Sequence, residues 1–105
     1  MILMCTGTYP LTSAMKAADV FLENASVDPI PDYIDTLGFY TQWGGDGIVF
    51  YLILDVEDGK VDDGVRALTK RFVNYKSVEG YKVEIQVVLP IAEALAAIGK
   101  EAPAA

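Results

Sequence analysis

The sequence predicts one small α+β domain in which an antiparallel sheet carries two long helices on a single face. Three observations lead to this fold class: the chain has only 105 residues, 52% of them are hydrophobic, and strand-like and helix-like patterns alternate along it. A chain of this length supports a single hydrophobic core. We therefore expect residues 1–100 to form one domain and residues 101–105 to form a flexible tail.

The first third of the chain predicts a strand, a helix and a loop. Residues 1–8 form a largely apolar run typical of a strand, and Pro10 fits the first turn of a following helix. Apolar residues then recur at helical spacing, and we expect them to form the buried face of that helix: Leu11, Ala14, Met15, Ala18, Leu22 and Ala25. Pro29 and Pro31 end the pattern and predict a loop.

The middle of the chain predicts a β-hairpin. Side chains of residues 34–43 alternate in character, as expected of a half-buried strand. The two predicted faces carry Leu37, Phe39 and Trp43 on one side and Ile34, Tyr40 and Gln42 on the other. Residues 44–47 contain three glycines and predict the turn, since glycine adopts a positive φ without steric cost. Ile48–Val56 is the strand that leaves the turn.

The last third predicts a helix, a strand and a short helix. Asp58 and Gly59 open a helix whose buried stripe is expected to contain Val61, Val65, Leu68 and Phe72. Apolar and polar residues alternate from Tyr81 to Val87, which predicts a strand. Pro90 starts a short helix that ends at Gly99. One side of this short helix is expected to carry Ile91, Ala94, Leu95 and Ile98.

The resulting order, βαββαβ plus a short C-terminal helix, is the ferredoxin-like pattern. Its two long helices cover only one face of the sheet. However, the strand from Ile48 to Leu54 carries apolar side chains on both of its faces, so the second face of the sheet must also be shielded from water. A second copy of the same sheet would supply it, and two such sheets packed face to face form a dimeric α+β barrel. We therefore expect a homodimer.

Four local features are spread over nearly the whole chain: the Gly-rich hairpin after Trp43, the Asp58-Gly59 helix start, the Gly80-Tyr81 pair and the strand end at Pro90. This layout resembles a group of small uncharacterised bacterial proteins of the dimeric α+β barrel superfamily. The resemblance implies the fold but not a function, because the wider superfamily includes cofactor-independent monooxygenases, isomerases, haem enzymes and effector-sensing domains.

Composition excludes several classes of function. Fifteen acidic residues against eight basic ones give a net charge of -7, which disfavours nucleic acid as a partner. The chain has no histidine and a single cysteine, Cys5, which excludes histidine-ligated haem, zinc sites and the usual hydrolase triad. No apolar run approaches the ~20 residues of a membrane helix. We expect a cytoplasmic protein without cofactors and without membrane contact.

An acidic cluster surrounds Gly59 and consists of Asp55, Glu57, Asp58, Asp62 and Asp63. An EF-hand loop needs glycine as its sixth residue and glutamate as its twelfth. Placing Gly59 sixth puts Leu54 first, and placing Asp55 first puts Arg66 twelfth, so both registers fail. The cluster is therefore interpreted as a solvated helix start, and no metal site is expected.

The second sheet face is where we expect a functional site. Strand parity gives it Tyr40 and Gln42 from one strand and Glu84 and Gln86 from another. The central hairpin strand adds either Tyr51 and Ile53 or Phe50 and Leu52, and Thr6 and Thr8 are further candidates. Our candidate ligand-binding residues are Tyr40, Gln42, Tyr51, Glu84 and Gln86. This mixture of aromatic and polar groups suits a small-ligand pocket, and it equally suits a wet dimer interface.

Three functions remain open. The first is a homodimer that binds a small molecule between its two sheets. The second is a cofactor-independent enzyme, monooxygenase-like or isomerase-like, that uses Tyr40, Gln42 and Glu84 as polar groups; Glu84 would become a general base if burial raised its pKa. The third is a structural or interaction dimer without a pocket.

Overall fold

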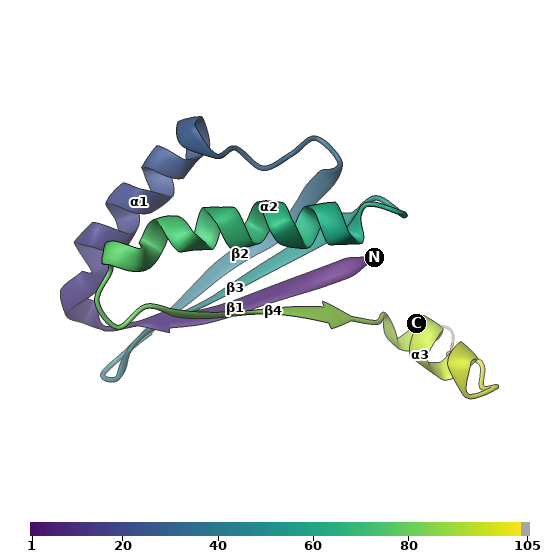
Figure 1. The fold of residues 1–105 in the computed structure, drawn as a ribbon. Coiled ribbons are helices and arrows are strands. Elements are labelled where there is room, and N and C mark those ends of the chain that lie inside the picture. The colour runs from purple at the N-terminus through teal and green to yellow at the C-terminus, as the bar shows by residue number, and fades with distance from the viewer. Residues whose placement is uncertain (104–105) are drawn as a thin grey trace.

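The computed structural model describes residues 1–103, which form one four-stranded antiparallel sheet with two long helices on the same face (Figure 1). The elements are β1 (Ile2–Tyr9), α1 (Ala14–Val27), β2 (Ile34–Gly44), β3 (Gly47–Val56), α2 (Val61–Val73), β4 (Lys82–Val88) and α3 (Ile91–Ala97). The strand order is β2-β3-β1-β4. The predicted α+β class and βαββαβ order are confirmed. The predicted tail at 101–105 ends outside the described residues.

Helix α2 packs on the sheet as its sequence predicts. Leu68 is fully buried, and Val61, Val65 and Phe72 pack around it against the core. The strands contribute the other buried members of this cluster: Leu3, Cys5, Ile34, Leu52, Leu54 and Val56. Asp62 and Asp63 lie in the first turn, while Lys70 and Arg71 lie in the last turn, as the helix dipole favours.

The predicted buried face of α1 is wrong. The side chains that α1 buries are those of Ala17, Val20 and Asn24. Met15 is 79% exposed and Leu22 is 68% exposed, and of the six residues predicted to be buried only Ala14 is half-buried. The cause is Asn24, whose amide donates to the carbonyl of Arg71 (3.2 Å) and accepts from Asn74 (2.7 Å). These bonds satisfy a buried polar side chain and fix that face of α1 toward α2.

The simple alternation predicted for β2 is also wrong, because a β-bulge interrupts the strand. The register against β3 shifts between Thr36 and Gly38, so one extra residue lies in β2. Ile34, before the bulge, is buried beneath the helices, whereas Tyr40 and Gln42, after it, lie on the opposite face. Ile34 therefore does not share a face with Tyr40 as expected.

Helix α3 lies beyond the end of β4, away from the two long helices (Figure 1). None of its residues is buried, and only Ala94 and Leu95 of the predicted apolar side are half-buried. No helix within residues 1–103 combines the length and apolar character that crossing a membrane requires.

Cys5 should react slowly with a polar thiol reagent. It is fully buried on the central strand β1, and burial raises the pKa of its thiol to about 11, which leaves little of the reactive thiolate. Labelling with 5,5′-dithiobis(2-nitrobenzoate) at pH 8 should be at least about 100-fold slower in buffer than in urea. Equal rates in the two conditions would show that β1 is not held in the centre of the sheet.

Candidate functional site

The sheet face without helices carries all five candidate residues of the sequence analysis. Cross-strand neighbours form one row that runs Tyr40, Tyr51, Thr6 and Glu84 from β2 to β4. The Tyr51 hydroxyl donates to Gln42 Oε1 (3.3 Å), and Gln86 Nε2 lies 3.5 Å from Glu84 Oε2. Of the two alternatives for β3, Tyr51 and Ile53 lie on this open face, whereas Phe50 and Leu52 are buried beneath the helices.

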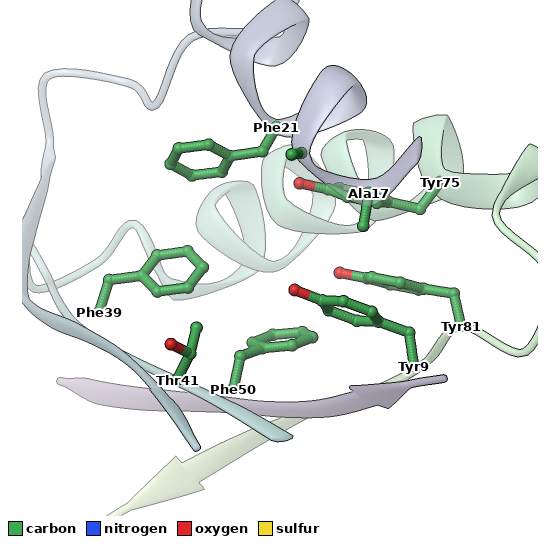
Figure 2. A pocket seen from close by; sticks show the side chains of 9 residues that line it. Tyr9, Ala17, Phe21, Phe39, Thr41, Phe50, Tyr75 and Tyr81 are labelled. Atoms are coloured by element: carbon green, nitrogen blue, oxygen red, sulfur yellow. The ribbon is translucent and has the colours of Figure 1, made fainter. Parts of the chain in front are cut away.

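The opposite face holds a pocket that the sequence analysis did not identify. It lies between α1 and the sheet and has a volume of about 390 Å³ (Figure 2). We call it the tyrosine pocket. Its lining contains six aromatic residues, Tyr9, Phe21, Phe39, Phe50, Tyr75 and Tyr81, together with Ala17, Ala18 and Thr41. No charged side chain is among these residues.

Three tyrosines from separate parts of the chain form a stack at the pocket. The rings of Tyr75 and Tyr81 are 4.4 Å apart between centroids and 11° from parallel, and Tyr9 stacks on Tyr81 at 5.8 Å and 12°. Gly80 allows this arrangement, because a Cβ there would lie 2.7 Å from the Pro10 ring and its φ is +77°. Tyr81 is thereby brought beside Tyr9.

The tyrosine hydroxyls are neutral hydrogen-bonding groups. Burial raises the pKa of Tyr9, Tyr75 and Tyr81 above the usual value of 10, so all three remain protonated at neutral pH. Figure 2 shows the three hydroxyls directed to the same side, toward Phe21 and Phe39. Within residues 1–103 the hydroxyls of Tyr9 and Tyr81 make no hydrogen bond to another side chain or to the backbone. They are therefore free to donate to a bound molecule.

The floor and outer wall of the pocket are also aromatic. Phe50 of β3 lies between Phe39 (5.9 Å) and Tyr81 (5.7 Å), and Phe21 of α1 meets Phe39 edge-on at 5.4 Å and 76°. Phe39 and Thr41 reach this face because they follow the bulge in β2 and alternate with Tyr40. None of the five candidate residues lines the pocket. The sequence signal that points to this pocket is a tyrosine next to a turn residue at two places in the chain: Tyr9 precedes Pro10, and Tyr81 follows Gly80.

The acidic cluster around Gly59 does not gather into a metal site. Asp63 is paired with Lys60 (3.9 Å) and Arg66 (3.6 Å) on the surface of α2. In the part of the chain that the structure describes, no three histidine, cysteine, aspartate or glutamate side chains are placed to hold a metal ion together.

Comparison with known proteins gives a fold and no family. The chain matches no protein-family model and no curated protein. Among solved structures, it is similar to a formyltetrahydrofolate deformylase from Pseudomonas putida KT2440 (TM-score 0.55, 11% identity), covering 84% of this chain and 29% of that one. The chain therefore spans less than a third of that enzyme's length.

Two further similarities involve whole chains. A proposed antibiotic biosynthesis monooxygenase from Deinococcus radiodurans aligns with a TM-score of 0.51 and 10% identity over 86% of this chain and 94% of its own. The fold is ferredoxin-like. The resemblance to dimeric α+β barrel proteins is thus confirmed at the level of the fold. The de novo designed protein Foldit4 also shares this ferredoxin-like fold (TM-score 0.55, 9% identity, 85% of this chain and 94% of its own), so the fold alone selects no function.

Proposed function

We propose that this protein binds a small, planar, largely apolar molecule in the tyrosine pocket. The observation that carries the proposal is the pocket itself, about 390 Å³ in volume and lined by six aromatic side chains and no charged ones. Ligand pockets for small molecules have volumes of roughly 300–1,000 Å³ and combine apolar walls with a few polar groups. The tyrosine pocket has this composition.

The aromatic walls favour a ring system as the ligand. Near-parallel tyrosine rings and the Phe21–Phe39 pair offer both faces and edges to a planar molecule. The hydroxyls of Tyr9 and Tyr81 donate hydrogen bonds and have no partner within residues 1–103, so the ligand should carry an acceptor such as a carbonyl oxygen. An uncharged ring with one or two carbonyl groups meets both requirements.

The enzyme alternative is a cofactor-independent monooxygenase or isomerase. Its support is the fold shared with the proposed Deinococcus monooxygenase, at 10% identity. General acid–base chemistry needs a group that exchanges a proton near neutral pH. The lining of the tyrosine pocket has only tyrosines with raised pKa values, and Glu84 lies on the opposite sheet face. We therefore favour binding over catalysis.

We further propose that the open sheet face joins two copies into a homodimer. Its central strands β3 and β1 contribute half-buried side chains, among them Val49, Tyr51, Ile53 and Met4, with no helix above them. The edge strand β4 contributes Lys82, Glu84 and Gln86. An apolar centre with a polar rim is the usual anatomy of a protein interface. A ligand site between two sheets, lined by Tyr40, Gln42, Tyr51, Glu84 and Gln86, would exist only in such a dimer.

Filling the tyrosine pocket should abolish binding without unfolding the protein. Ala18 lines the pocket yet is exposed on α1, so Ala18→Phe adds a ring to the pocket and disturbs no buried contact. Isothermal titration with flavone, a neutral planar ketone, should show binding to the wild type and at least about tenfold weaker binding to Ala18→Phe.

The matched control is Ala92→Phe, which adds the same ring to an exposed position on α3. It should bind flavone as the wild type does. Equal affinities for the wild type and Ala18→Phe, or no binding of either flavone or anthraquinone to the wild type, would refute the proposed site.

A further inference from the structure

The space between α1 and β2 continues past the tyrosine pocket. A second pocket of about 350 Å³ shares Phe21 and Phe39 with the first. Along α1 the lining passes from Ala18 in the first pocket to Ala25 in the second, and along β2 it passes from Thr41 to Thr36. The two pockets are therefore consecutive parts of one groove between the helix and the edge strand, which we call the α1–β2 groove.

Only two side chains divide this groove. Phe21 and Phe39 meet edge-on at 5.4 Å, and they are 45% and 43% exposed. Side chains with this exposure change rotamer on the picosecond-to-nanosecond timescale. The division is therefore a side-chain contact that a long ligand can displace.

The far part of the groove contains a cation that forms no ion pair within residues 1–103. Arg71 lines it together with Pro29, Ile30, Leu52 and other apolar residues. The Nη1 of Arg71 donates to the backbone carbonyls of Asn24 (3.3 Å) and Asp28. Those bonds use one end of the guanidinium and leave Nε and Nη2 free as donors.

The Asp28 carboxylate is already bonded to two other side chains. Asp28 accepts from Asn74 (2.7 Å) and from Lys70 (3.1 Å), and these two bonds, with the charges of Lys70 and Arg71 nearby, hold the pKa of Asp28 below its usual range. No carboxylate within residues 1–103 forms an ion pair with Arg71. A charge held at the end of an apolar groove is stabilised when an anion pairs with it there.

We infer that the α1–β2 groove binds an amphipathic monocarboxylic acid, with its ring in the tyrosine pocket and its carboxylate on the free edge of Arg71. This inference rests on the proposed function and specifies the ligand class of the same site. The planar guanidinium fork matches a carboxylate in a bidentate arrangement. A net charge of -7 on the chain favours a singly charged ligand over a doubly charged phosphate.

The groove also sets the length of the ligand. Ala25 lies seven positions after Ala18, a rise of about 10 Å along α1. A linker of that length between ring and carboxylate corresponds to about eight methylene groups. Shorter acids would leave the carboxylate among the apolar residues next to the Phe21–Phe39 pair, where desolvation is not compensated.

The test compares acids with their uncharged primary amides. Isothermal titration uses ω-(2-naphthyl)alkanoic acids of increasing chain length and the corresponding amides, with flavone competition to show that the ring occupies the tyrosine pocket. With a linker of about eight methylene groups, the acid should bind at least about tenfold more tightly than its amide. For the shortest linkers, the acid and its amide should bind equally well. In Arg71→Gln the acid should lose its advantage while the amide binds as before.

Arg66→Gln is the matched control, since it removes the same charge from an exposed position on α2. It should preserve the preference for the acid. If Arg71→Gln does not fold, the comparison of acids with amides in the wild type and in Arg71→Lys still tests the inference. Lysine keeps the positive charge but lacks the planar fork, so Arg71→Lys should show a reduced but measurable preference for the acid. If the amides compete with flavone but the acids bind no more tightly than the amides, this inference is overturned and the proposed function is not. Failure of both compound series to compete with flavone would instead contradict the proposed function.

Discussion

Gly7→Ala should lower the melting temperature by more than about 10 °C, corresponding to a loss of about 3 kcal/mol. A Cβ at this position in β1 would lie 2.2 Å from Cε2 of Phe50 and 2.5 Å from the carbonyl oxygen of Lys82. Phe50 cannot retreat freely, because it packs against Phe39, Phe72 and Tyr81. The added methyl group must displace either the aromatic floor of the tyrosine pocket or strand β4.

Gly45→Ala is the control for this substitution. Gly45 lies in the β2–β3 turn, where no atom comes within 4 Å of an added Cβ. Its melting temperature should stay within a few degrees of the wild type. The double variant Gly7→Ala/Phe50→Leu should recover only part of the loss, since the Lys82 carbonyl remains in place. A thermal melt of Gly7→Ala that matched the wild type would show that β1, β4 and Phe50 are packed less closely than described.

Light scattering after size exclusion should give a mass of about twice 11.4 kDa at micromolar concentration. The physical reason is the open sheet face, where Val49, Tyr51 and Ile53 of the central strand β3 have no covering helix. Ile53→Glu should raise the dissociation constant of the dimer by about 100-fold or more, because the interface would bury an unpaired charge.

The matched control for the dimer is Thr69→Glu, which adds the same charge to an exposed position on α2. It should leave the mass at that of a dimer. A wild-type chain that elutes as a monomer, or an Ile53→Glu variant as dimeric as the wild type, would remove the open face as the interface. The tyrosine pocket lies within one chain and would be unaffected by that result.

Much of the fold could be predicted because its determinants are local in the sequence. The stripe of α2 is a single run at helical spacing, and β3 is a continuous apolar run after a glycine-rich turn, so both elements could be placed correctly, although the sequence left open which face of β3 is buried. Helix α1 has two apolar stripes, and spacing cannot distinguish between them. The choice depends on Asn24, whose partners Arg71 and Asn74 are about 50 residues away in the chain.

The candidate site was harder to predict for a different reason. Hydrophobic patterning indicates which side chains are covered, but it does not reveal whether the space between two covered surfaces is full. The tyrosine pocket arises because α1 presents the small residues Ala17 and Ala18 to Phe39 and Thr41 of the edge strand. The open face, in contrast, follows from strand parity, which is why Tyr40, Gln42, Glu84 and Gln86 could be grouped without a structure, with Tyr51 joining them as one of two alternatives for β3.

The bulge at Thr36–Gly38 makes β2 two functional segments in one strand. Before it, Ile34 helps to close the core; after it, Phe39 and Thr41 face the groove while Tyr40 and Gln42 face outward. Deleting the single residue Leu37 would remove the bulge and leave the partners of the other β2 residues on β3 unchanged. Phe39 and Thr41 would still face the groove, and Tyr40 and Gln42 would still face outward. The bulge is therefore what lets β2 hold one extra residue without exchanging the ligand-facing and partner-facing sets of side chains. Within a family that keeps this architecture, chains that lack the extra residue should therefore lack the bulge and keep the same side chains on each face.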